Sequence, residues 1–229
     1  MKVNNTNSRR SFITKLGAGF LAGGLALFPE SLKASVKNES LKTGKEPSLD
    51  LVIKQVGKKE HPVAFDTSQA IPYGFIWSNV YFKTNKDTGT PENKLGVLVV
   101  LRHGGIIFAL NDETIKKFRL GERTKLKDPK TKKVITNNPY YDIPDNFIGR
   151  KGFTGIKGLQ EKGAVFCVCD MALQSTSAYV AKKMNLDADD VYKEIVAGIL
   201  PGIYPAPSGV WALGRLAENN ISYIDASVA

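Results

Sequence analysis

Two apolar runs stand out in the pattern of hydrophobic and polar positions. Leu95–Leu101 reads Leu-Gly-Val-Leu-Val-Val-Leu, and Ala164–Cys169 reads Ala-Val-Phe-Cys-Val-Cys. Neither run alternates between apolar and polar residues, which is typical of a strand buried on both faces, as in a parallel sheet. A third strand is predicted over residues 221–225.

Helical patterns separate and follow these strands. Asn111 and Ser208 are plausible N-caps because their short polar side chains can accept a bond from the first turn. The helices are predicted over residues 112–120, 153–162, 170–184, 188–200 and 209–219. Strands that alternate with helices predict an α/β domain with a mostly parallel sheet.

The pattern before residue 95 is weaker. Residues 35–50 are polar and aperiodic, which predicts a linker, so the folded domain is expected over residues 51–229. Residues 49–56, 63–66 and 75–82 are interpreted as short extended segments. They would form an N-terminal extended region, as an antiparallel edge or a small extra layer.

The first 34 residues have the pattern of an export signal. Arg9 and Arg10 precede a short run rich in Leu, Gly and Ala, and at about 13 residues this run is too short for a comfortable membrane span. The paired arginines indicate the twin-arginine route to the periplasm. An ordinary secretory signal is the alternative. Because residues 32–34 form a poor cleavage site, an uncleaved anchor on the outer face of the cytoplasmic membrane is a second one.

Charge adds a moderate preference for anions. The chain of 229 residues has a formal net charge of +10, of which residues 1–34 carry +4. No dense basic stripe is interleaved with aromatic residues, so no nucleic-acid partner is expected. A Lys-rich insertion is predicted near residues 122–145, either as an anion patch or as a solvated hairpin. Membrane contact is expected only through an uncleaved signal.

The two cysteines of the chain, Cys167 and Cys169, supply the candidate chemistry. Cys169 ends a predicted strand and precedes a helix, whose partially positive N-terminus favours a thiolate. Strand periodicity puts both thiols on one face, with Cys167 deeper and buried as a small hydrophobe. A disulfide between them is not expected while the segment stays extended.

A second group follows the other buried strand. If the two strands are neighbours, His103 could act on Cys169 as a base or a cation. Arg102 could hold an anion, while Gly104 and Gly105 would let a ligand approach the backbone. The candidate ligand-binding set is completed by Asp170 and Ser208. A metal site made of Cys167, Cys169 and His103 is an alternative, but no metal or other cofactor is expected because zinc-site spacing and phosphate-binding loops are absent.

Three motifs in order resemble the DsrE/DsrF-like superfamily. They are the helix–strand–cysteine segment at residues 158–173, the strand ending in His103-Gly104, and residues 200–213 with the Ile221-Ser-Tyr-Ile ending. This resemblance covers residues 95–225, apart from the Lys-rich stretch. It implies a three-layer α/β/α domain, and the expected partner is a second copy, since members often form homo-oligomers.

Some members of that superfamily pass persulfide sulfur through the strand-end cysteine, a role that would fall on Cys169. The first functional hypothesis is therefore an exported protein of sulfur or thiol chemistry. The alternative is a non-catalytic periplasmic module that binds a small anion or serves as an accessory protein. Neither alternative names a physiological substrate.

Overall fold

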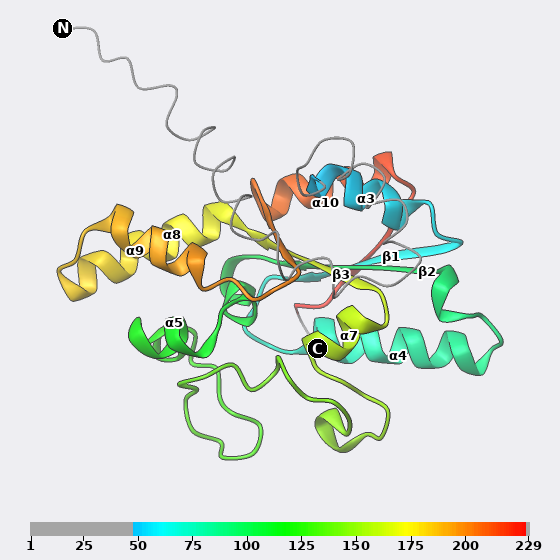
Figure 1. Cartoon of the computed structure of the whole chain (residues 1–229), viewed down its shortest axis with the longest axis horizontal. Helices are drawn as coiled ribbons and strands as arrows, with labels where there is room; N and C mark the ends of the chain where they lie inside the picture. The colour runs from blue at the N-terminus through cyan, green and yellow to red at the C-terminus, as the bar shows by residue number, and fades with distance from the viewer. Residues whose placement is uncertain (1–47, 228–229) are drawn as a thin grey trace, which may run out of the picture.

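The computed structural model describes residues 48–227. The predicted signal at residues 1–34 and most of the predicted linker lie outside this range. A five-stranded, all-parallel sheet forms the centre, in the order β4-β3-β2-β1-β5 (Figure 1). Its strands are β1 (His61–Thr67), β2 (Leu95–Leu101), β3 (Ala164–Cys169), β4 (Ile203–Ala206) and β5 (Ser222–Asp225). The predicted α/β class with a parallel sheet is confirmed.

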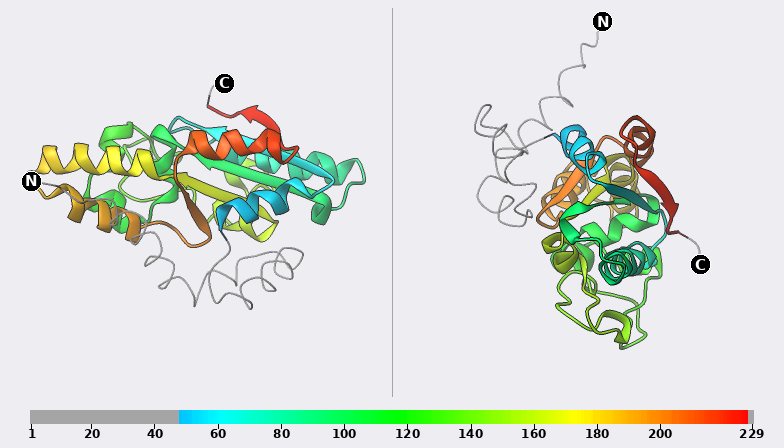
Figure 2. Two further views of the ribbon diagram at one scale, coloured as in Figure 1. Left: turned by 90° about the horizontal axis from the view of Figure 1, so that it is seen from above. Right: turned by 90° about the vertical axis from the view of Figure 1, so that its right-hand side faces the viewer.

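Helices cover both faces of this sheet and make a three-layer α/β/α arrangement. One face is covered by α3 (Leu49–Gly57) and α10 (Gly209–Glu218), and the other by α4 (Tyr73–Asp87) and α7 (Ile156–Glu161) (Figures 1 and 2). The remaining elements are η2 (Glu92–Lys94), η3 (His103–Ala109), α5 (Asp112–Lys117), α6 (Leu120–Thr124), η4 (Phe147–Gly149), α8 (Asp170–Met184) and α9 (Ala188–Ala197). Helices α8 and α9 pack against each other and extend beyond the carboxyl end of β3.

The order of the strands explains which helix lies on which face. From β1 to β4 each strand is placed beside the previous one in a single direction. Because crossovers between parallel strands are right-handed, a constant direction keeps the connections on one side of the sheet. The last connection runs back across the sheet to place β5 beside β1, so α10 lies on the opposite side.

Two segments expected to be extended are helical. Ser48 accepts a bond from Leu51 and caps α3, whose buried residues Leu49, Val52, Ile53 and Val56 follow helical spacing. Ser48 and the start of α3 therefore lie inside the segment predicted as a linker, residues 35–50. Residues 75–82 lie within α4, not in a strand. The predicted antiparallel edge was therefore wrong, and β1 is an inner strand of the parallel sheet.

Residues 122–145, the predicted insertion, contain little regular structure after α6. A single antiparallel bridge pairs Lys127 with Val134, and buried Leu126 and Ile135 anchor the hairpin to the domain. The segment between α6 and α7 loops away from the sheet on the side opposite α3 and α10 (Figures 1 and 2). Within residues 48–227, none of the helices combines the length and the apolar character needed to cross a membrane.

Candidate functional site

Cys169 lies where the connections of two neighbouring strands diverge. It is the last residue of β3 and pairs with Ala206, the last residue of β4. The chain leaves β3 into α8, whose buried residues join the core beside α4, and leaves β4 into α10 on the opposite face. In open α/β sheets, ligands bind at such a switch point outside the carboxyl ends of the strands. Cys169 therefore occupies a position at which ligands bind in open α/β sheets.

The condition for a shared site, that the two apolar strands are neighbours, is met by the backbone. Strands β2 and β3 are adjacent, and their register pairs Leu101 with Val168. Arg102 and Cys169 follow directly, and Arg102 keeps an extended backbone, so these two residues are neighbours at the end of the sheet. The sequence motifs thus converge on one edge.

The guanidinium of Arg102 forms an ion pair with Asp66, a residue that the sequence pattern did not identify as part of the site. Its Nε and one terminal nitrogen donate to Asp66, each at 2.8 Å, and the Tyr223 hydroxyl donates to the same carboxylate at 3.1 Å. Asp66 is fully buried, and this pair raises the pKa of Arg102. The sequence signal that could have revealed Asp66 is its position directly after the apolar run at residues 63–65.

The first turn of α10 lies on Arg102. Ser208 accepts a bond from the backbone of Trp211 at 3.0 Å, which confirms its predicted role as the cap. Gly209 is required here, because a β-carbon on it would lie 2.6 Å from Cβ of Arg102. The partially positive start of this ten-residue helix, Arg102 and Cys169 therefore meet at the same end of the sheet.

Both thiols are buried, and Cys167 is confirmed as the deeper of the two. It is fully buried in the core beneath α3 and α10, whereas Cys169, 7% exposed, packs with the core of the opposite face. The prediction that both thiols lie on one face of the sheet was therefore wrong, because the chain turns into α8 at Cys169. Burial raises the pKa of the Cys167 thiol above its usual value of 9.0, and the nearby charges of Cys169 and Asp66 raise it further.

This raised pKa leads to an expected pH dependence of stability. Above pH 9 the unfolded chain loses the Cys167 proton while the folded chain keeps it, so the free energy of unfolding falls as the pH rises. The free energy of unfolding, measured by urea titration at several values between pH 9 and 10.5, should fall less steeply with pH in Cys167→Ala than in the wild type. The difference should be up to about 1.4 kcal/mol per pH unit. Equal slopes in the two proteins would contradict the burial of this thiol.

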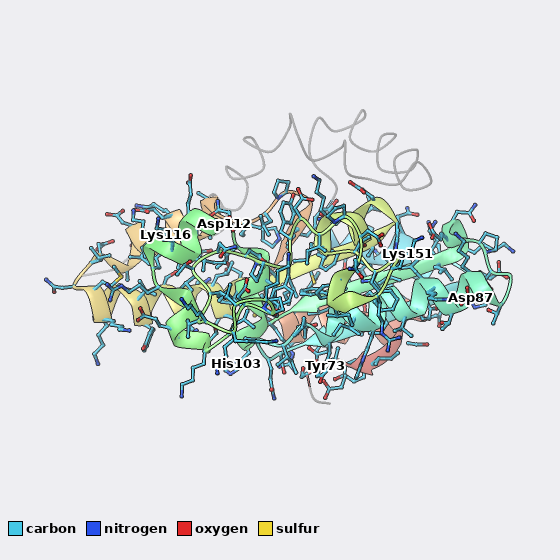
Figure 3. The ribbon with its side chains drawn as sticks, turned by 90° about the horizontal axis from the view of Figure 1, so that it is seen from below. Tyr73, Asp87, His103, Asp112, Lys116 and Lys151 are labelled. Atoms are coloured by element: carbon cyan, nitrogen blue, oxygen red, sulfur yellow. The ribbon has the colours of Figure 1, made fainter. Side chains whose placement is uncertain are left out.

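His103 reaches the predicted edge but shows no link to the thiol. It lies exposed at the end of β2 (Figure 3), with a backbone φ of 48°. In the described part of the chain, its side chain forms no hydrogen bond or ion pair with Cys169 or with any other group. A role for His103 in catalysis stays a prediction.

Gly104 and Gly105 have a structural explanation. A β-carbon on Gly105 would lie 2.2 Å from the Thr67 carbonyl oxygen, and the backbone nitrogen of Gly104 donates to Ser68 at 2.9 Å. The loop after β1 therefore occupies the space that was expected for a ligand. These glycines allow two segments of backbone to approach each other.

Asp170 connects the two projecting helices. Its carboxylate accepts bonds from Tyr192 of α9 at 2.5 Å and from Gln174 at 2.6 Å. Burial, followed by the bond to Asp170, raises the pKa of Tyr192, so this hydroxyl remains a donor. Asp170 thus positions α9 against α8, and its role toward a ligand stays a prediction.

Metal-ligating side chains and cavities of the described residues bear on the candidate chemistry. Among residues 48–227, no three side chains of the metal-ligating types lie close enough to share an ion. An open cavity of about 560 Å³ lies between α5 and the insertion, near Asp112 in Figure 3. The cavity contains none of the predicted site residues. Its lining residues are Asn111, Asp112, Glu113, Asn137, Asn138, Pro139, Tyr141, Asp142 and Leu200.

Comparison of the chain with protein-family models, curated proteins and solved structures finds no match. The resemblance to the DsrE/DsrF-like superfamily therefore rests on the three sequence motifs.

Proposed function

We propose that this chain is an exported DsrE-like protein that accepts sulfane sulfur on Cys169. The observation that carries the proposal is the place of Cys169 at the switch point of the sheet, beside Arg102 and the first turn of α10. The export signal predicted over residues 1–34 would put this chemistry in the periplasm.

The proposed step transfers one sulfur atom without net oxidation. The Cys169 thiolate attacks the outer sulfur of a persulfide, R–S–SH, and forms a new S–S bond. The old S–S bond breaks, its electron pair leaves with R–S⁻, and Cys169 becomes a persulfide. Because Cys169 is only 7% exposed, the donor at this position must present a small, unhindered sulfur atom.

Cys167 is unsuited to compete in this step. A thiol must ionise to attack, and burial raises the pKa of Cys167 well above its usual value. An internal disulfide would also require Cys167 to leave its packing beneath α3 and α10. A persulfide formed on Cys169 is therefore expected to await an external acceptor.

Treatment of the reduced protein with inorganic polysulfide tests the proposal. Whole-protein mass spectrometry should show the gain of one sulfur atom in the wild type and in Cys167→Ser. Cys169→Ser should show no such gain. The two variants are matched, since both alter a buried thiol of β3, and circular dichroism verifies that each is folded. Sulfur uptake on Cys167 alone, or on neither thiol, would overturn the proposal.

The alternative, a non-catalytic module for a small anion, has weaker support. Arg102 and the start of α10 provide positive charge, but Asp66 already neutralises the guanidinium. This alternative would be favoured if Cys169→Ala retained binding of sulfate or thiosulfate while Arg102→Ala lost it.

A further inference from the structure

The hairpin at residues 125–134 concentrates the positive charge of the domain. Residues 116–133 hold nine Lys and Arg side chains against two carboxylates, a net charge of +7 in a chain whose total is +10. Five of those lysines belong to the hairpin: Lys125, Lys127, Lys130, Lys132 and Lys133. All five are exposed. The positive potential is therefore local and not spread over the surface.

Among the described residues, carboxylates do not neutralise these five lysines, whereas they pair with many of the other surface lysines. Elsewhere in the described chain, lysines such as Lys54, Lys94 and Lys157 form ion pairs with carboxylates. Within residues 48–227, no ion pair involves a lysine of the hairpin. The one carboxylate of the hairpin, Asp128, instead accepts backbone bonds from Lys130 and Thr131 and shapes the turn. The charge is thus left available to an external anion.

The hairpin has a defined shape. Lys127 and Val134 form its antiparallel bridge, and the backbone nitrogen of Ile135 donates to Leu126 at 3.0 Å. At its base, Gly121 allows contact with Ile135, because a β-carbon on Gly121 would lie 2.0 Å from the Ile135 carbonyl oxygen. The lysines therefore project from a folded support anchored by Leu126 and Ile135, and little ordering is needed when they bind.

We propose that this hairpin binds the surface of an anionic lipid bilayer. Lysines near such a surface gain electrostatic attraction without any specific geometry, and Val134, 42% exposed, adds an apolar side chain beside them. Nucleic-acid surfaces add aromatic or Arg side chains that stack on bases or read them, and residues 125–134 contain neither. The observations thus favour lipid, through a contact separate from any anchor in residues 1–34.

Flotation of the full chain with vesicles tests this contact. The variant in which Lys127, Lys130, Lys132 and Lys133 are all changed to Gln should bind phosphatidylglycerol vesicles at least about tenfold more weakly than the wild type at low salt. A control removes the same charge elsewhere by changing Lys58, Lys83, Lys86 and Lys94 to Gln, and it should bind nearly as well as the wild type. Neutral phosphatidylcholine vesicles should bind none of the three proteins through the hairpin.

A local reporter separates the hairpin from the N-terminal segment, which all the variants share. Val134→Trp should add a fluorescence component that shifts to shorter wavelength with anionic vesicles, while Val80→Trp on α4 should not. Equal binding by the two quadruple variants, an unshifted Val134→Trp, or tighter binding of a single-stranded oligonucleotide than of anionic vesicles would each overturn the proposal.

Discussion

Replacing Asp66 with asparagine is expected to lower the free energy of unfolding by about 3 kcal/mol. Asp66 is fully buried and accepts two bonds from Arg102 and one from Tyr223. An amide cannot accept the paired bonds of the guanidinium, and removal of one partner of a buried pair leaves the other charge uncompensated. Because Arg102 is 31% exposed and keeps access to water, we place the loss at the lower end of the range for such pairs.

Two comparisons isolate this effect. In the exposed Lys83–Asp87 pair, Asp87→Asn should cost less than about 1 kcal/mol in the same urea titration. The double variant Asp66→Asn with Arg102→Gln should be more stable than the sum of the single losses predicts. Strict additivity of the two substitutions would show that the pair does not couple β1 to the end of β2.

Phe75→Ala is expected to cost about 3–5 kcal/mol, the largest loss among these predictions. Phe75 is fully buried in α4, and its ring centroid lies 4.9 Å from that of Phe108, 6.1 Å from Phe166 and 6.2 Å from Tyr140. The ring therefore joins α4 to η3, to β3 and to the insertion. Its removal leaves a cavity where four segments meet.

Val80→Ala provides the matched control on the same helix. Val80 is 39% exposed, so its truncation should change the free energy of unfolding by no more than about 0.5 kcal/mol. Similar losses in the two variants would mean that the aromatic cluster does not hold α4 against the sheet.

The same helix shows where local sequence reasoning fails. Residues 75–82 contain large aromatic and β-branched side chains that favour strands, yet the buried positions of α4 fall at Gly74, Phe75, Ser78, Asn79 and Phe82. Residues 49–56 place apolar side chains at both a spacing of two and a spacing of three to four. Such short segments fit either period, and packing against the sheet selects the helix.

The candidate site divides in the same way. The end of β3 at Cys169 and the cap at Ser208 were readable because each depends on neighbouring residues. The partner of Arg102 was not, because Asp66 lies 36 residues earlier and the two meet only through the pairing of β1 with β2. Likewise, the glycines after β2 were assigned to a ligand, whereas the loop after β1 occupies that space.

The sequence by itself thus determined the class of the fold and the strands β2 and β3. Leu95–Leu101 and Ala164–Cys169 are apolar at every position, and only burial on both faces of a parallel sheet satisfies such runs. The tertiary structure alone decided the strand order, the face on which each helix lies and the neighbours of Cys169. These features depend on strand register and crossover direction, which join residues far apart in the chain and leave no local pattern in it.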